Sequence, residues 1–172
     1  RSRLFGDKLA SLPFCVYGGI LASTDEATET LRSAACKLAQ QLDVDALEMR
    51  NTHPSDSGWP VKDLYYTFRK SISADHDANL KAIPAKQRAM VRKGIAAGLS
   101  SEEDPDCTRF YRVYAESVRN LGTPVFSRRY LELLREEFAN DCRVLMISDG
   151  REDVAGVMSF YFRGEVLPYY GG

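Results

Sequence analysis

The chain has 172 residues, of which 44% are hydrophobic and 27% charged, values typical of a soluble globular protein and not of a disordered one. This length suits one ordinary domain or parts of two. The formal net charge of -1 excludes a general attraction to nucleic acid or to anionic membranes, so a charged partner requires a local patch. The sequence has no apolar run of transmembrane length and no signal-peptide pattern, so we predict no membrane span.

The cysteines and histidines show no pattern of metal ligands. The four cysteines are far apart and form no C-x-x-C pair, and the chain has only two histidines. We therefore predict no metal site. Scattered thiols are typical of a reducing compartment, which favours the cytoplasm.

The first part of the chain predicts a strand, a helix and a second strand. Residues 12–17 are a short apolar run and are expected to form a buried strand. Ser23 and Glu26 have the spacing of a capping box, which opens a helix that runs to about residue 42. Residues 44–49 alternate between apolar and polar side chains, as a strand does.

The middle of the chain changes in character. Residues 64–68 are rich in β-forming side chains and predict another strand. A polar link over 73–79 follows it. Pro84 suits the first turn of a helix and Gly98 suits its C-terminal end, so a helix is predicted between them.

Two more helices are predicted in the second half of the chain. One begins at about Asp104 and ends near Asn120, and the other is capped by Ser127. Their apolar faces are expected to line the core, with the following side chains: Phe110, Tyr111, Tyr114, Val118, Tyr130, Leu131, Leu134 and Phe138. Three strands follow, over 143–147, 154–162 and 165–170, and short turns between them predict an antiparallel meander.

The two ends of the chain nearly repeat each other. LPFCVYGG at 12–19 resembles LPYYGG at 167–172, at a separation close to one domain length. A tandem duplication explains this, and coincidence of short pieces is the alternative. With a duplication, the chain holds the back half of one domain and the front half of its twin, and neither end is expected to be a natural domain terminus.

Four segments resemble FemAB-like proteins of the GNAT acyltransferase superfamily. They are LKAIPAKQRAMVRKG at 80–94, FYRVYAESVRNLGTP at 110–124, SFYF at 159–162 and LPYYGG at 167–172. The chain is most similar to the group associated with PEP-CTERM/exosortase systems, and the resemblance covers nearly its whole length.

The resemblance implies an α+β, GNAT-like mixed sheet flanked by helices, in parts of two tandem domains. Residues 1–72 correspond to the C-terminal part of a first domain, 73–105 to a linking segment with a basic helix, and 106–172 to the N-terminal part of a second. A GNAT domain runs strand, two helices, three antiparallel strands, helix, strand, helix, strand. The part after the fourth strand, which shapes the donor pocket, has no counterpart here, so the fragment alone is expected to be inactive.

The resemblance also implies where acyl transfer occurs. GNAT-type enzymes align an amine with an acyl carbonyl that backbone N–H groups polarise, usually at the splayed end of the fourth strand. That position corresponds to Tyr169 and Tyr170, which we take as candidate catalytic residues. The alternative is that both are simply large sheet residues beside a Gly-Gly turn. No general base is assigned.

A basic stretch is the candidate substrate-binding site. It contains Lys81, Lys86, Arg88, Arg92 and Lys93, with no acidic residue between positions 79 and 100. Arg88 and Arg92 are four apart and share a helix face, so they could hold a phosphate or carboxylate. A plain solvated face is the alternative.

Residues 159–162 raise a question of orientation. Tyr161 is a further candidate for contact with the substrate, and Ser159 shares its face of the strand. Phe160 and Phe162 lie on the other face, and the sequence leaves open which face lines the core.

The resemblance implies an acyl- or aminoacyltransferase of cell-envelope or exopolysaccharide metabolism. The donor is expected to be acyl-CoA or an aminoacyl-tRNA, and the acceptor an amine or hydroxyl of an anionic small molecule or sugar-nucleotide-linked precursor. The chain lacks the GNAT pyrophosphate loop R/Q-x-x-G-x-G/A, which weakens the case for CoA, and the short 122–126 link weakens that for tRNA.

Three further expectations concern partners. A non-catalytic binding module of an envelope-assembly system is the alternative function. Direct nucleic-acid binding is disfavoured by the near-zero charge. Half-domains leave sheet edges open, so the truncated chain could form a homodimer.

Overall fold

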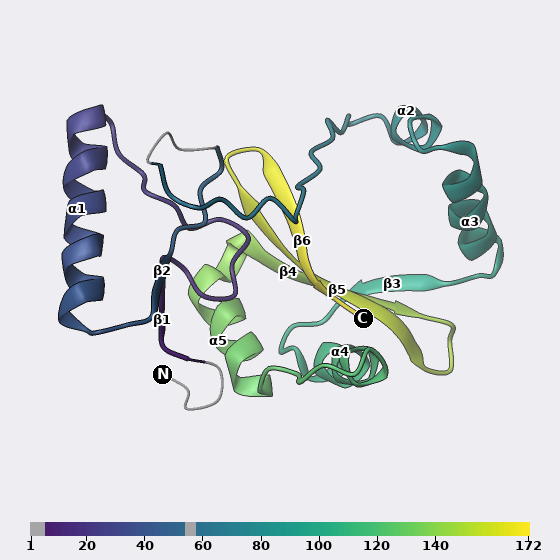
Figure 1. The fold of residues 1–172 in the computed structure, drawn as a ribbon. Coiled ribbons are helices and arrows are strands. Elements are labelled where there is room, and N and C mark those ends of the chain that lie inside the picture. Colours follow the sequence, from purple (N-terminus) through teal and green to yellow (C-terminus); the bar gives the residue numbers. More distant parts are fainter. Residues whose placement is uncertain (1–5, 54–57) are drawn as a thin grey trace. The chain divides into compact units, whose positions relative to one another are not determined.

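The computed structural model describes residues 6–53 and 58–172. The chain divides into two compact units, Arg1–Arg69 and Lys70–Gly172, which are described separately below (Figure 1). In the described part of the first unit no side chain is fully buried, whereas the second unit contains a closed hydrophobic core.

The first unit pairs two short parallel strands that a helix connects. Strand β1 (Lys8–Ala10) lies beside β2 (Ala46–Glu48), and α1 (Asp25–Gln41) connects them. The predicted helix and second strand are thus confirmed, but the predicted cap is wrong. Thr24, which has an extended backbone, accepts a hydrogen bond from the backbone N–H of Ala27 at 3.1 Å and so begins the helix one residue later.

Two strands predicted in the first unit are wrong. Residues 12–17 form bends and a turn, and Phe14 has a φ of 63°, which a continuous strand does not tolerate. Residues 64–68 are irregular, and the Phe68 side chain is 92% exposed. Apolar and β-branched side chains favour a strand only where a neighbouring strand and a covered face are available. The tandem-domain assignment stays a prediction, although 12–17 and 165–171 differ in structure.

The second unit is built around one four-stranded antiparallel sheet in the order β3-β4-β5-β6 (Figure 1). Its elements, in chain order, are α2 (His76–Lys81), α3 (Ala85–Ala96), β3 (Ser100–Glu103), α4 (Thr108–Asn120), α5 (Arg128–Phe138), a 3-10 turn (Ala139–Asp141), β4 (Cys142–Ser148), β5 (Asp153–Phe162) and β6 (Glu165–Gly171). This confirms the predicted helices and meander. It adds α2 and β3, which the sequence analysis missed because both are polar and β3 is exposed along its length.

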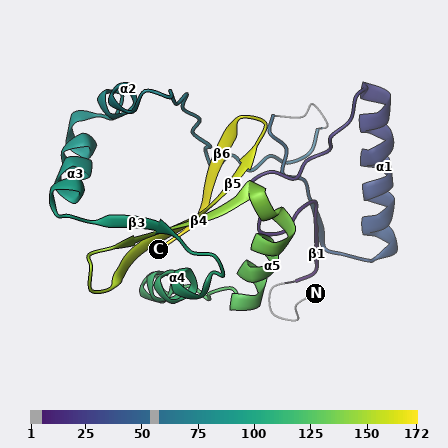
Figure 2. The ribbon, with the colours of Figure 1, turned by 180° about the vertical axis from the view of Figure 1, so that it is seen from behind.

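Helices α4 and α5 cover the same face of this sheet (Figure 2). On α4, Phe110, Tyr114 and Val118 recur every four residues and are buried, as the amphipathic pattern predicts. Leu131 of α5 and Met146 of β4 meet them in the core. Full burial of one such side chain contributes about 1.5–3 kcal/mol. The predicted core residue Phe138 is 48% exposed, because it lies in the last turn of α5.

Helix α4 begins later than Asp104, where the sequence placed its start. Both aspartates of the Asp104-Pro-Asp106 segment accept hydrogen bonds from first-turn N–H groups instead. The Oδ2 atom of Asp104 accepts from Phe110 at 2.9 Å, and Oδ1 of Asp106 accepts from Thr108 at 3.0 Å. These bonds satisfy N–H groups that a helix leaves open, and they fix the direction in which α4 leaves the sheet.

Candidate active site

Strand β6 contains a β-bulge at the position that the sequence analysis selected. Met158 of β5 pairs with Tyr170, but the next residue, Ser159, pairs with Pro168. Strand β6 therefore has one extra residue, Tyr169, within this ladder. A bulge bends its strand and turns backbone groups away from regular pairing, and bulges are frequent beside active sites.

An aromatic cluster holds the bulge from the helical side of the sheet. Tyr170 is buried, with 8% of its surface exposed, and its hydroxyl lies 3.1 Å from the hydroxyl of Tyr130 in the first turn of α5. Phe126, in the link between α4 and α5, contacts both rings, at centroid distances of 4.8 Å to Tyr130 and 6.0 Å to Tyr170. The Ser127 hydroxyl accepts a hydrogen bond from the Tyr130 N–H and so fixes the start of α5.

The two candidate catalytic tyrosines have different surroundings. Burial, and then the hydrogen bond with Tyr130, raise the pKa of Tyr170 above its ordinary value, so its hydroxyl stays protonated at neutral pH and cannot serve as a base there. Tyr169 is half-buried, and its ring packs against Phe160 at 6.1 Å. Both side chains therefore lie in aromatic packing, and any role in acyl transfer falls to the backbone of the bulge.

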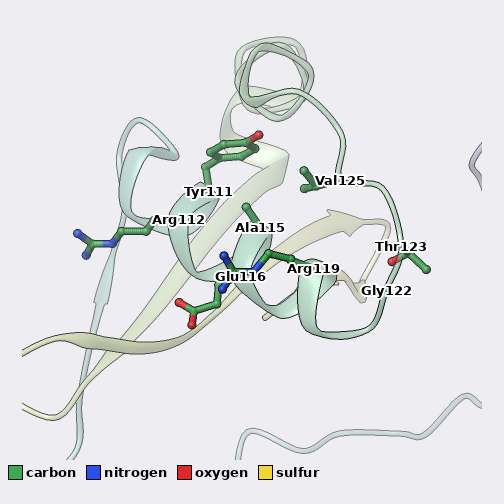
Figure 3. Close-up of a pocket in the computed structure, with 8 residues that line it drawn as sticks. All are labelled: Tyr111, Arg112, Ala115, Glu116, Arg119, Gly122, Thr123 and Val125. Carbon is green, nitrogen blue, oxygen red and sulfur yellow. The ribbon is translucent and has the colours of Figure 1, made fainter.

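An open hollow of about 900 Å³ lies along the outer face of α4 and the link to α5 (Figure 3). Its walls include the apolar side chains of Tyr111, Ala115 and Val125, with Arg119 and Glu116 on the helix beside them. The remaining lining residues are Arg112, Gly122 and Thr123. This hollow was not predicted, because the sequence analysis assigned Tyr111 to the core and treated 122–126 only as a short connection.

Ion pairs fix α4, and with it the hollow, to the sheet. The Asp153 carboxylate at the start of β5 accepts hydrogen bonds from Arg109 at 3.0 Å and from Arg112 at 3.1 Å. Arg109 also pairs with Glu102 of β3. The hydrogen bonds from Arg109 hold the pKa of Asp153 below its ordinary value, so the carboxylate is ionised at neutral pH.

The five basic side chains proposed to bind substrate lie on α2 and α3. One of them, Arg88, has a structural role, and three others are exposed. Arg88 donates a hydrogen bond to the carbonyl oxygen of Lys81 at 2.9 Å, which places a cation at the C-terminal end of α2. Lys70 donates to the neighbouring Ala82 carbonyl at 2.9 Å. Arg88 thus has a structural function that the sequence did not reveal.

Lys86, Arg92 and Lys93 are exposed on α3. Within residues 6–53 and 58–172, none of these three side chains forms an ion pair. Helix α5 shows the opposite arrangement, because its Arg128 and Arg129 pair with Glu132. The basic face of α3 therefore differs from an ordinary solvated helix face, where acidic and basic side chains alternate.

Tyr161 lies on the face of β5 that the helices do not cover. Phe160 packs against the core, whereas Tyr161 is 40% exposed and has the Arg143 guanidinium 5.7 Å from its ring centroid. The orientation that the sequence left open is thus resolved, and Tyr161 is on the opposite side of the sheet from the Tyr130–Tyr170 contact.

The described parts of the chain contain neither a cluster of metal-type ligands nor a helix that could span a membrane. Among those residues, no three His, Cys, Asp or Glu side chains are grouped as a metal site would require. None of the helices described above is both long enough and apolar enough to cross a bilayer.

Comparison with known protein families gives a match. The family model for the acetyltransferase (GNAT) domain matches residues 85–172, from the first residue of α3 through all of β6. No curated protein matches the sequence. After α3, the matched region holds a strand, two helices and three antiparallel strands, with the bulge in the last strand. The chain belongs to the GNAT acetyltransferase domain family.

Proposed function

We propose that this protein transfers an acyl group from acyl-CoA to an amine or hydroxyl acceptor at the bulge of β6. The bulge is the observation that carries the proposal, since it lies in the fourth strand of the matched GNAT domain. Domains of this family catalyse acyl transfer in general and use acyl-CoA as the donor.

Backbone N–H groups supply the chemistry in this proposal. When an acceptor attacks the thioester carbonyl, negative charge develops on the carbonyl oxygen, and the CoA thiolate then leaves while the acceptor loses its proton. One N–H donor aimed at that oxygen contributes about 3–4 kcal/mol. Alignment of acceptor and thioester accounts for about 7–11 kcal/mol of barrier in favourable cases. A catalytic side chain is therefore not essential.

The acceptor in this proposal is an anionic, sugar-linked precursor of the cell envelope or an exopolysaccharide, as in FemAB-like proteins of PEP-CTERM systems. Lys86, Arg92 and Lys93, which form no ion pair within the part of the chain that the structure describes, support it, because charge-assisted hydrogen bonds to phosphate or carboxylate are among the strongest that side chains form. Lys81, Arg88 and Tyr161 are retained as secondary contacts. An aminoacyl-tRNA remains a second candidate donor.

The proposal includes the compartment of the protein and its association with a second copy. We place it in the cytoplasm, which agrees with the four free cysteines. We also propose that two copies associate, because β3 and β6 each have only one neighbour in the described sheet. A single monomeric species at high concentration in light scattering would contradict this association.

Thiol release from acetyl-CoA, measured with a panel of amines and UDP-sugars, tests the function. We expect transfer to an anionic acceptor, and we expect Arg92→Ala with Lys93→Ala to raise the acceptor KM about ten-fold, through loss of charge-assisted hydrogen bonds. Lys37→Ala, an exposed cation on α1, is the matched control and should leave the KM unchanged. Binding of acceptors without any transfer would favour the non-catalytic binding module.

A further inference from the structure

Tyr130 is the residue through which the helical layer contacts the bulge. It lies in the first turn of α5, and its hydroxyl is within hydrogen-bond distance of Tyr170, 40 residues further along the chain. Its ring meets the Tyr170 ring edge-on at 6.3 Å. Because Tyr170 is buried and immediately follows the extra residue of the bulge, a shift of its side chain displaces the β6 backbone.

The same contact extends to the wall of the hollow. Val125 lines the hollow, and the next residue, Phe126, packs against both Tyr130 and Tyr170. The link between α4 and α5 therefore places Val125 at the hollow and its neighbour Phe126 on the bulge side. If a molecule bound in the hollow displaced the link, Phe126 and Tyr130 would transmit that displacement to the β6 backbone.

The hydroxyl pair gives this contact its specificity. Apolar rings alone tolerate small sliding motions, whereas a hydrogen bond between two hydroxyls sets one distance. The Tyr170 hydroxyl is held in apolar surroundings, so loss of its partner leaves a buried polar group unsatisfied.

We propose that Tyr130 is a positioning residue for acyl transfer, which holds Tyr170 and thereby sets the β6 backbone at the bulge relative to the hollow. This inference rests on the proposed function, because positioning matters only if the bulge receives the acyl carbonyl. In this proposal Tyr130 acts through Tyr170 and not through contact with donor or acceptor.

Amide hydrogen exchange of the full chain, followed by NMR, tests the role of Tyr130 without any substrate. Tyr130→Phe keeps the ring and removes the hydroxyl. We expect the amides of Tyr169, Tyr170 and Gly171 to exchange about ten-fold faster, as expected for an unsatisfied buried hydroxyl, while those of Val144 and Met146 change less. Tyr17→Phe removes a hydroxyl from a half-buried ring in the first unit and is the matched control, which should leave the bulge unchanged.

The double variant Tyr130→Phe/Tyr170→Phe supplies the decisive comparison. With both hydroxyls gone no polar group is left unsatisfied, so protection at the bulge should return towards the wild-type value. Tyr170→Phe alone serves if Tyr130→Phe fails to fold. An equal rise at all core amides, or no rise at the bulge, overturns the role of Tyr130. If the variants exchange as expected but the wild type transfers no acyl group, the proposed function is overturned and the contact between Tyr130 and Tyr170 is not.

Discussion

The core of the second unit raises the pKa of one of its side chains, the Cys107 thiol. Cys107 is fully buried at the start of α4. Burial first, and then the negative charge of Asp104, raise its pKa from the ordinary 9.0 to about 11. Its left-handed backbone, with a φ of 62°, is equally strained for Cys and Ala, so a Cys107→Ala substitution leaves that cost unchanged.

We predict that Cys107 weakens the fold at alkaline pH. Between pH 9 and about 11 the thiol ionises in the unfolded chain but stays protonated in the folded one, so the stability it contributes below pH 9 is lost as pH rises through that range. The wild type should lose about 1.4 kcal/mol per pH unit more than Cys107→Ala. Urea titrations at several pH values measure this, and parallel curves for the two proteins would contradict it.

Gly156, on β5, lies where a side chain of α4 packs closely against the sheet. A Cβ atom there would lie 2.8 Å from the sulfur of Met146 and 2.9 Å from a ring carbon of Phe110. Both neighbours are fully buried and have no free space. The packing of α4 on β5 therefore requires glycine at position 156.

We predict opposite effects for two glycine-to-alanine changes. Gly156→Ala should destabilise the protein by about 1–3 kcal/mol through overpacking. Gly94 lies inside helix α3, and in Gly94→Ala the nearest described atom to the new Cβ belongs to Leu99, at 3.8 Å. Stability should therefore rise by about 0.5–1 kcal/mol. Urea midpoints of both variants measure the pair, and a neutral Gly156→Ala would show that the α4–β5 packing is wrong.

The elements that the sequence predicted correctly are those with long, regular patterns. Helices α1, α4 and α5 have amphipathic patterns over 11 or more residues, α3 is bounded by Pro84 and Gly98, and short turns separate strands β4, β5 and β6. Residues 64–68 have the composition of a strand but are irregular, because no strand pairs with them in the described structure. Strand β3 lacks that composition and is still a strand, because it pairs with β4.

The candidate site was predictable only in part, for a related reason. Tyr169 and Tyr170 lie at the end of a recognisable strand, so their position follows from local sequence. The contacts of Tyr170 with Phe126 and Tyr130 join residues about 40 positions apart, and they depend on how α5 packs. Likewise, the bond from Arg88 to the Lys81 carbonyl depends on the turn between two helices, and no periodicity indicates it.

The two units differ in how much of each is buried. The second has ten buried hydrophobic side chains around its sheet, whereas the described part of the first has none and pairs only three residues of each strand. Two-stranded pairing without a core is marginally stable. Local stability should therefore differ sharply along the chain.

We predict that amides of α1 exchange with solvent at least ten-fold faster than those of β4 and β5, as expected where few apolar groups are buried. Hydrogen exchange on the full chain, resolved by residue, measures this. Equal protection in α1 and β5 would mean that the first unit is stabilised by contacts other than those described.

In the proposed function the bulge of β6 binds an acyl carbonyl, and a titration of the ¹⁵N-labelled full chain with acetyl-CoA and, separately, with CoA tests this binding. CoA lacks the thioester carbonyl and is the matched control. We expect the amide resonances of Tyr169, Tyr170 and Gly171 to shift with acetyl-CoA and much less with CoA. Identical responses to both ligands at these three amides, or no response to either, would contradict it.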